Sequence, residues 1–306
     1  MAAAQTPPGE VTTPPPAEGT MRLKLEDVHR DGERRIALTR EKFRVRGFVR
    51  PYVAGQRVEV RFLRKGRVIH RVTKRLRPVN GGRAGSFMTA YRARRAGPIA
   101  VRAVHAPTPQ LAAVRAPTQW LAVLQPDLST ATMVRLLQKG LRKLRYAVPR
   151  SGSYDSGTAR AVMAYRKVRG LARTYTATRE IVRDVLRGRG AFHVRYPEDG
   201  RHVEADLSRQ VLALIEGDEV ERIYHISSGS PYTPTVLGRF RVYRKSPGTN
   251  SHGMVHSSYF IGGYAIHGYA SVPAYNASHG CLRVPIPDAW SIYQWIGMGD
   301  VVRVYP

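Results

Sequence analysis

The single cysteine of the chain, Cys281, has neighbours that suit nucleophilic catalysis. It lies in the run Ser278-His-Gly-Cys-Leu-Arg283, fourteen residues after His267. A thiol attacks a carbonyl carbon as its thiolate, and a nearby imidazole or clustered backbone N–H groups promote its ionisation. A lone cysteine cannot form an internal disulfide. The pattern therefore predicts a catalytic cysteine rather than a structural one.

The residues beside Cys281 and His267 could supply the other requirements of acyl transfer. Gly280 permits a backbone conformation that a Cβ would forbid, so the amides of Gly280 and Cys281 can converge on one point as an oxyanion hole. His267 and His279 are the candidate bases. Gly268 keeps the backbone beside His267 thin, so that a carbonyl can orient the ring. We expect a thiolate–imidazolium pair at neutral pH.

Several of these residues have a second interpretation. An isolated cysteine is often a small buried hydrophobe. His279 is either a general acid or a hydrogen-bond donor that braces the loop, and Arg283 either binds substrate or forms a structural salt bridge. His252 and His256 have a spacing that suits a metal site with His279 and Cys281, but no second cysteine or acidic ligand accompanies them. We expect no metal and no cofactor.

The charge of the chain is concentrated in one segment. The 306 residues carry a net charge of +28, with 50 Lys and Arg against 22 Asp and Glu. Residues 41–190 hold 34 basic and 6 acidic residues, whereas residues 1–40 and 191–306 are each balanced. A polycation of this kind favours nucleic acid, anionic lipid or the anionic polymers of a bacterial envelope. We expect it to localise the protein rather than to take part in chemistry.

The N-terminal region has the composition of a tail. Residues 1–20 are rich in Pro, Thr and Ala, and residues 21–40 are mixed, so we assign 1–40 to a disordered tail or linker. The start has no basic region followed by an apolar core, and we interpret its small residues as the remnant of a removed signal peptide. No run of about 18 uncharged apolar residues occurs, so no membrane span is expected.

Residues 41–117 show the pattern of short strands. Apolar and basic residues alternate over Phe43–Phe48 and Val58–Phe62, with turns expected at Lys65-Gly66 and Asn80-Gly81-Gly82. The pattern predicts a basic β-sandwich-like domain. Arginines that alternate along a strand usually mark a solvated sheet face. Because no aromatic ladder or nucleic-acid fingerprint accompanies them, no nucleic-acid partner is expected.

Residues 118–190 change to helical periodicity. Asp155 can cap a second helix that ends at Gly170, and a third helix is expected near Ala177–Leu186. The first helix carries an apolar stripe at spacings of three and four: Val134, Leu137, Leu141 and Leu144.

This segment resembles the three-helix peptidoglycan-binding domain. The resemblance rests on Leu137-Gln138, Leu144-Arg-Tyr146, Gly152–Thr158 and Ala161–Tyr165. The chain has Tyr154-Asp155 and Tyr165-Arg166 where the family usually has Phe-Gly and Phe-Gln. The resemblance implies a helical fold that binds peptidoglycan. The alternative is a structural helical spacer, because a fold does not establish a site.

Residues 191–306 return to strands. One short helix, Pro287–Ile296, is expected behind the loop that carries Cys281. The segment is therefore predicted to be a mainly-β catalytic domain. The expected strands are Val203–Leu207, Gln210–Ile215, Val220–Ile226, Gly238–Tyr243, Gly263–Ile266 and Val301–Tyr305.

Ala265–Gly268 together with Ala277–Arg283 resembles the L,D-transpeptidase (YkuD) catalytic domain. Two upstream stretches support this resemblance: Ala205–Leu212 looks like the opening hairpin of the family, and Ser228–Phe240 contains its Thr-Pro-Thr stretch. The resemblance covers about 191–306. The pair Val236-Leu237 before Gly238 departs from the family, and we expect a loop difference there.

The resemblance implies a role for each matching residue. Cys281 would be the nucleophile and His267 the base, with the Gly268 carbonyl orienting the imidazole. Ser278 would brace the loop. The backbone N–H groups that stabilise the oxyanion would come from His279, Gly280 and Cys281. Arg283 would hold a carboxylate of the substrate, and the rest of the substrate groove is expected to include Tyr264, Tyr259, Met254 and His256.

The resemblance also implies a reaction. An extracytoplasmic enzyme would form a thioester between Cys281 and a peptidoglycan donor stem, release D-Ala, and cross-link two diaminopimelate residues. A carbapenem would acylate the same cysteine. Two alternatives remain open. One is an L,D-carboxypeptidase or hydrolase, in which water resolves the thioester. The other is a basic, non-catalytic protein that binds anionic wall polymer through residues 41–190.

Overall fold

The computed structural model of the protein describes residues 14–306. The part of the predicted tail that covers residues 1–13 lies outside the described residues. The chain forms two compact units, which divide after Gln125.

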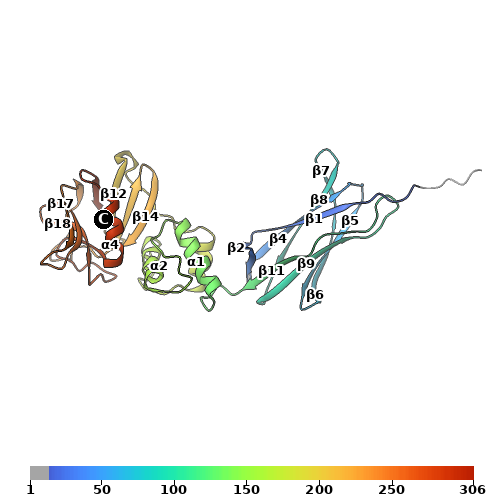
Figure 1. Cartoon of the computed structure of the whole chain (residues 1–306), viewed down its shortest axis with the longest axis horizontal. Coiled ribbons are helices and arrows are strands. Elements are labelled where there is room, and N and C mark those ends of the chain that lie inside the picture. The colour runs from blue at the N-terminus through green and yellow to red at the C-terminus, as the bar shows by residue number, and fades with distance from the viewer. Residues whose placement is uncertain (1–13) are drawn as a thin grey trace, which may run out of the picture. The chain divides into compact units, whose positions relative to one another are not determined.

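The first unit contains two sheets (Figure 1). The smaller sheet is antiparallel and has the strand order β1-β4-β8-β7. The larger has the order β2-β3-β11-β9-β5-β6, with β10 paired to β9. The bounds are β1 Thr20–Glu26, β2 His29–Asp31, β3 Arg34–Leu38, β4 Lys42–Arg50, β5 Arg57–Arg64, β6 Arg67–Arg75, β7 Arg77–Val79, β8 Ala84–Arg92, β9 Gly97–His105, β10 Val114–Arg115 and β11 Gln119–Leu124.

The two sheets share one hydrophobic core. Phe43 and Val45 of β4 lie in the same buried cluster as Val60 and Phe62 of β5, and all four are fully buried. Alternate residues of each strand point to one face, so each sheet contributes its apolar face to this core. The prediction of a β-rich N-terminal domain is confirmed, and the expected turn at Asn80-Gly81-Gly82 joins β7 to β8.

The predicted limits of this domain were wrong at both ends. Strands β1 to β3 lie within residues assigned to the tail, and β11 lies within residues assigned to the helical segment. Met21 and Leu25 are buried on the same face of β1, and Ile36 is fully buried in β3. These strands are short, and charged residues interrupt their apolar pattern, which explains why periodicity alone did not reveal them.

The second unit begins with three helices, α1 Ala131–Lys143, α2 Ser156–Val168 and α3 Arg179–Leu186. Each has an N-cap side chain that accepts a hydrogen bond from the first turn: Thr130, Asp155 and Thr178. The predicted apolar stripe of α1 is buried. The helices therefore occur where the sequence indicated, but they belong to one compact unit with the sheets that follow them in the chain.

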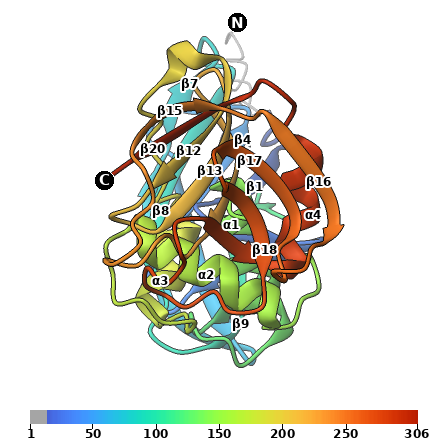
Figure 2. The same cartoon turned by 90° about the vertical axis from the view of Figure 1, so that its left-hand side faces the viewer.

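The rest of this unit consists of a five-stranded sheet, β14-β13-β12-β20-β15, and a four-stranded sheet, β16-β17-β18-β19 (Figure 2). Helix α4 follows β19 directly, as predicted, and packs on β17 and β18. The bounds are β12 Arg201–Asp206, β13 Val211–Glu216, β14 Glu219–His225, β15 Gly238–Arg241, β16 Arg244–Thr249, β17 Val255–Ile261, β18 Tyr264–Tyr269, β19 Leu282–Pro285, α4 Ile286–Trp295 and β20 Val301–Tyr305.

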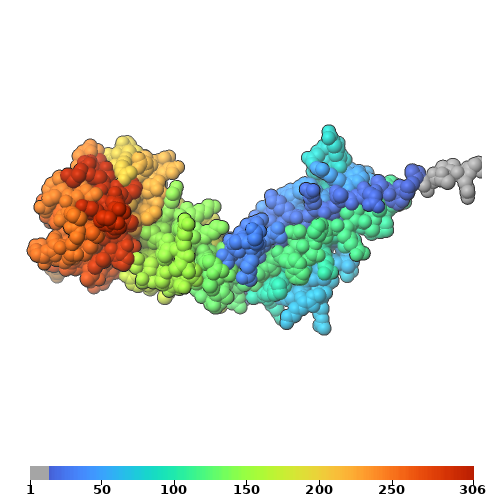
Figure 3. Space-filling model, in the orientation of Figure 1, coloured from blue at the N-terminus to red at the C-terminus, as the bar shows by residue number. Residues whose placement is uncertain are grey.

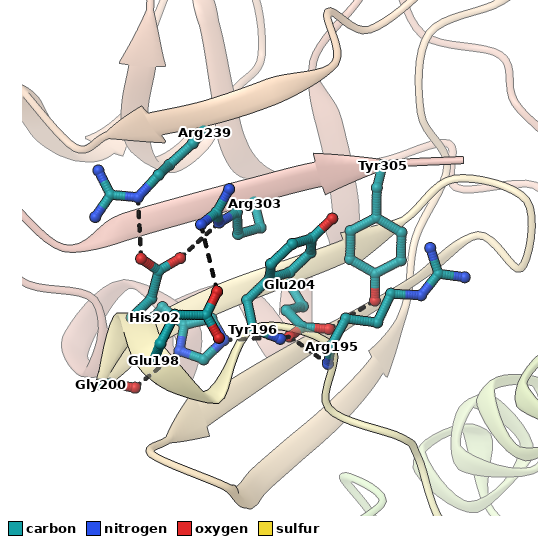
Figure 4. A network of polar contacts seen from close by, with 10 residues as sticks. Arg195, Tyr196, Glu198, Gly200, His202, Glu204, Arg239, Arg303 and Tyr305 are labelled. Carbon is teal, nitrogen blue, oxygen red and sulfur yellow. Dashed lines mark hydrogen bonds and ion pairs between the residues drawn. The ribbon is translucent and has the colours of Figure 1, made fainter.

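A buried polar network fastens the segment before β12 to the five-stranded sheet (Figure 4). Glu204 is fully buried and accepts hydrogen bonds from the amides of Arg195 and Tyr196, each 2.8 Å, and from the Tyr305 hydroxyl, 2.7 Å. Its carboxylate also lies 3.3 Å from Nε2 of His202. Burial alone would raise the pKa of Glu204, but these hydrogen bonds outweigh it and lower the pKa.

Within residues 14–306, none of the helices combines the length and the apolar character that a membrane crossing requires.

Candidate active site

Strands β18 and β19 bring the predicted catalytic residues together. They run parallel, with His267 opposite Arg283. Cys281 lies in the bend immediately before β19, two residues before Arg283. Cys281 and His267 both line one cavity of about 340 Å³. The residues that line it are His252, Met254, His267, Tyr269, Ser278, His279, Cys281 and Arg283.

The His267 ring is held in one tautomer by the backbone. Only 3% of the residue is exposed, and Nδ1 lies 2.9 Å from the carbonyl oxygen of Gly268. A carbonyl can only accept, so Nδ1 carries the proton and Nε2 is the basic nitrogen. A Cβ on Gly268 would lie 2.7 Å from the Cβ of Ala289, so glycine is needed where α4 packs on β18. The Gly268 carbonyl, which was expected to orient the His267 ring, thus accepts the hydrogen bond from Nδ1.

The thiol of Cys281 lies against the β17–β18 hairpin. It donates to the carbonyl of Gly263 over 3.7 Å and is also hydrogen-bonded by the amide of Ala265. The residue is only partly buried, so a reagent can reach the sulfur from the cavity. A neutral thiol suits the contact with a carbonyl oxygen, because a thiolate could not donate to it.

Electrostatics favour the neutral forms of both groups. Burial raises the pKa of the Cys281 thiol, against the effects of the Ala265 amide and the Arg283 charge. Burial is also the main reason that the pKa of His267 falls to about 4, and the positive charge of Arg283 acts in the same direction. Both shifts favour a neutral thiol and a neutral imidazole over the expected thiolate–imidazolium pair.

Ser278 braces the loop of residues 277–281, the predicted nucleophile loop, and changes the expected oxyanion hole. Its hydroxyl donates to the carbonyl of Cys281 over 2.6 Å and accepts the amide of Gly280 over 3.0 Å. In this structure the Gly280 N–H, one of the predicted oxyanion donors, already has the Ser278 hydroxyl as its partner. The amides of His279 and Cys281 are the remaining predicted donors.

Gly280 is required by its backbone and by its neighbour. Its φ is +111°, which side chains with a Cβ rarely adopt, and a Cβ there would lie 1.8 Å from Cε1 of Tyr264. Tyr264 thus packs against the nucleophile loop instead of standing free in the cavity.

Two threonines that the sequence did not single out hold the loop from the other side. Thr235 donates to the carbonyl of Gly280 over 2.7 Å, and Thr233 donates to the carbonyl of Ser278 over 2.9 Å. The Thr235 hydroxyl also accepts the amide of Gly229 over 2.9 Å. The Thr-Pro-Thr stretch was a mark of family resemblance in the sequence, and here it fixes the backbone on both sides of His279.

The predicted substrate-binding residues separate into two groups. Arg283 and Met254 line the cavity, and the Arg283 guanidinium lies 4.1 Å from the ring centre of Tyr269. His256 and Tyr259 do not line it. His256 packs 4.8 Å from the Trp290 ring, and Tyr259 is buried beneath Arg244. Register shifts in the pairing of β17 with β18 occur next to both residues, so simple alternation along the strand does not determine which face their side chains occupy.

Tyr269 lines the cavity and was missed. The signal was available, because it lies two residues after His267 and so shares its face of β18. No group of three or more His, Cys, Asp or Glu side chains that could hold a metal ion occurs in the described part, residues 14–306.

Comparison with known proteins agrees with this geometry. The model of the L,D-transpeptidase catalytic domain (YkuD) matches residues 200–304. An L,D-transpeptidase structure from Xylanimonas cellulosilytica is 32% identical, with a TM-score of 0.53, and the match covers 58% of this chain and 95% of that one. The chain therefore belongs to the L,D-transpeptidase family.

Two further solved structures are more distant. An L,D-transpeptidase from Stackebrandtia nassauensis is 18% identical, with a TM-score of 0.37, over 56% of this chain and 90% of that chain. The Enterococcus faecium L,D-transpeptidase is 24% identical, with a TM-score of 0.31, over 35% and 50%. No curated protein matches the chain.

Proposed function

We propose that the protein is an extracytoplasmic L,D-transpeptidase that uses Cys281 as nucleophile on peptidoglycan stem peptides. The observation that carries this proposal is the shared cavity of Cys281 and His267, with the His267 tautomer fixed by the Gly268 carbonyl. A basic nitrogen that lines the same cavity as a partly exposed thiol, on a loop held by Ser278, suits covalent acyl transfer.

In the first half-reaction the donor stem loses D-Ala. Nε2 of His267 accepts the thiol proton while Sγ of Cys281 attacks the carbonyl carbon between the L-centre of diaminopimelate and D-Ala. The carbonyl electron pair moves to its oxygen, where the amides of His279 and Cys281 stabilise it. The C–N bond then breaks, the imidazolium gives its proton to the leaving amine, and a thioester remains.

In the second half-reaction the amine of another diaminopimelate attacks the thioester. His267 accepts the proton of this amine and returns it to the departing sulfur, so the enzyme is restored and the two stems are cross-linked. Arg283 lines the same cavity and can pair with a stem carboxylate. The volume of about 340 Å³ is near the lower end of ligand pockets and suits one stem end.

Purified tetrapeptide muropeptides test this proposal. The transpeptidase predicts cross-linked dimers with release of D-Ala, and Cys281→Ala should produce none. Tripeptide monomers without dimers would mean that water resolves the thioester, and the protein would then be a carboxypeptidase. Unchanged substrate, with a folded enzyme, would contradict both.

We also propose that the first unit binds anionic wall polymer through one face of its larger sheet. The strand register places arginines opposite one another on β6, β5 and β9: Arg71 faces Arg61, which faces Arg102, and Arg75 faces Arg57. Like charges directly opposite destabilise a sheet, and Glu59 offsets part of this repulsion by pairing with Arg61 and Arg71. An anionic polymer laid across these strands would relieve the repulsion.

The surface position of this arginine face is compatible with such binding. Arg57, Arg71, Arg75 and Arg102 are exposed, and the hairpin of β5 and β6 lies at the surface of the first unit (Figure 3). Periodicity along one strand indicated only a solvated face, because it cannot report which residues stand opposite on the next strand.

Wall sedimentation with two charge-matched variants tests the arginine face. Replacing Arg57, Arg71 and Arg102 by Gln should weaken binding and its salt dependence, as fewer counterions are released. The control replaces Arg22, Arg77 and Arg92 by Gln, three exposed arginines of the smaller sheet, and loses the same charge. Equal weakening by both variants would show that net charge alone acts and would contradict the proposal.

The residues behind the resemblance to peptidoglycan-binding helices serve the fold of this segment. Gln138 is buried and bonds the amide of Gly152 and the hydroxyl of Thr158, while Asp155 caps α2. These contacts support the peptidoglycan-binding type of fold that we propose for the helices.

A further inference from the structure

Lys167 of α2 is buried in the catalytic half of the second unit. Only 2% of the residue is exposed. Its Nζ donates to the carbonyls of Ile226, 2.8 Å, and Gln210, 3.1 Å, and lies 3.5 Å from Nδ1 of His225. An ammonium group has three donors, and these three acceptors satisfy it. Helix α2 is therefore hydrogen-bonded, through Lys167, to the backbone just before β13 and just after β14.

Gln210 and Ile226, whose carbonyls accept from Lys167, are hydrogen-bonded to each other, and Gln210 is also hydrogen-bonded to Ser228. Ile226 donates its amide to the carbonyl of Gln210 over 3.0 Å. The Gln210 side chain accepts the amide of Ser228 over 2.8 Å and donates to the Ser228 hydroxyl over 2.6 Å. Gln210 and Ser228 are both buried, so water does not substitute for these bonds.

Ser227 and Ser228 then contact the nucleophile loop directly. The carbonyl of Ser228 accepts the amides of Ala277 and Ser278, both over 2.9 Å. Ser227 exchanges two backbone hydrogen bonds with Arg283, each 3.0 Å. Since Ser278 bonds the carbonyl of Cys281, a continuous set of hydrogen bonds, buried as far as Ser228, runs from Lys167 to Cys281.

A second contact from the helical segment reaches the same loop. Arg173, between α2 and α3, donates to the carbonyl of Ala274 over 3.1 Å and to that of Ser208 over 2.6 Å. Ala274 precedes the nucleophile loop by a few residues, and Ser208 precedes Gln210. The helical segment thus contacts both the approach to Cys281 and the turn that supports it.

We propose that Lys167 is a positioning residue that fixes the nucleophile loop, with Arg173 assisting it from the same segment. This inference rests on the proposed function of Cys281. Burying an ammonium group costs free energy that an apolar side chain would avoid, so a spacer helix would gain more from Leu or Met at this position. The amino group is instead placed where it donates to two backbone carbonyls one step from the loop.

Lys167→Met, compared with Val182→Ala, separates positioning from stability. Val182 is fully buried in α3, and its truncation also destabilises the helical segment but breaks none of these hydrogen bonds. The readouts are the rate of Cys281 acylation by donor muropeptide, the donor KM, and hydrogen exchange of the amides of residues 274–283.

Lys167→Met should lower the acylation rate by about tenfold or more with little change in KM, because misplacement of a reacting group by about 1 Å can cost a hundredfold. It should also speed exchange in residues 274–283. Val182→Ala should keep the rate within about twofold and leave that exchange unchanged. Equal effects of the two variants, or wild-type behaviour of folded Lys167→Met, would overturn the proposal.

Arg173→Gln covers the case in which Lys167→Met does not fold, because Arg173 is exposed. It should slow acylation and speed exchange in residues 274–283, and no change in either would overturn the proposal. If wild-type enzyme is not acylated at all, the proposed function fails. In that case the exchange data alone support or overturn the role of Lys167.

Discussion

Cys281 and His267 are buried enough that neither is charged at rest near neutral pH. The thiol has a raised pKa, and the imidazole has a pKa of about 4. A general-base mechanism needs a neutral imidazole, so this arrangement keeps the base available over a wider acidic range than an ordinary histidine allows. The reactive form is then produced in the transition state rather than in advance.

The pH dependence of acylation follows from these shifts. As the pH falls through about 4, His267 takes up a proton and can no longer accept the thiol proton, so the rate should fall there. On the alkaline side the rate should still rise above pH 8.5, where an ordinary thiol is half ionised, because the pKa of Cys281 is raised. Acylation rates from pH 3 to 10 measure both limbs. An acidic midpoint near 6.5 would contradict this account.

Single residues of the site were predictable to different degrees. Cys281, His267 and Gly268 were identified from residue type and spacing, because thiol chemistry needs few groups in few arrangements. The engagement of the Gly280 amide was not predictable, since it depends on the rotamer of Ser278. The facing of His256 could not be predicted either, because a bulge and a φ of +51° turn it away from the cavity.

At the scale of elements, the nucleophile loop owes its shape to the Thr233–Thr235 stretch. Thr235→Val keeps the volume but removes the hydroxyl between Gly229 and Gly280, which leaves a buried amide and a buried carbonyl unpaired. We expect a loss of about 2 kcal/mol in the free energy of unfolding and slower acylation.

Urea unfolding and the acylation rate measure these two effects. Thr174→Val is the matched control, because Thr174 is exposed and its hydroxyl bonds the hydroxyl of Thr176, which is also exposed. Wild-type stability and rate in Thr235→Val would contradict the bracing role.

Elements with a clear period were predictable, and the others were not. Strands β4 and β5 alternate apolar and charged residues over most of their length, and they lie where the sequence indicated. Strand β16 was missed because Pro247-Gly248 within it indicates a turn. β19 has four residues, too few to show a period.

At the scale of the whole molecule, the predicted boundary before residue 191 disappears in the structure. Arg160 of α2 forms a hydrogen-bonded ion pair with Asp288 of α4, 2.9 Å, and Lys167 enters the sheet. These contacts join residues 43 to 128 positions apart, and such contacts leave no mark in local composition. The sequence therefore separated a helical domain from a catalytic one, although the two form a single unit.

The hydrogen bonds of Glu204, which lies in β12, should contribute to the free energy of unfolding of this unit. Glu204→Gln removes the charge that accepts from two amides and the Tyr305 hydroxyl, and should cost about 2 kcal/mol of unfolding free energy. Because the pKa of Glu204 is lowered by folding, its contribution is present above the unfolded value and is lost as the pH falls.

Urea unfolding at several pH values measures this contribution. Glu198→Gln is the control, since Glu198 is 62% exposed in its side chain and lies at the rim of the same network (Figure 4). Its effect should stay below about 0.5 kcal/mol. An equal loss of unfolding free energy in the two variants would contradict the claim that the buried Glu204 stabilises the unit more than the exposed Glu198 does.

The central claim is that Cys281 is the nucleophile, and intact-mass spectrometry after addition of a carbapenem tests it most directly. The wild-type protein should gain the mass of one carbapenem, and Cys281→Ala should gain none. An adduct that persists in the alanine variant, or a folded wild-type protein that stays unmodified, would contradict the account.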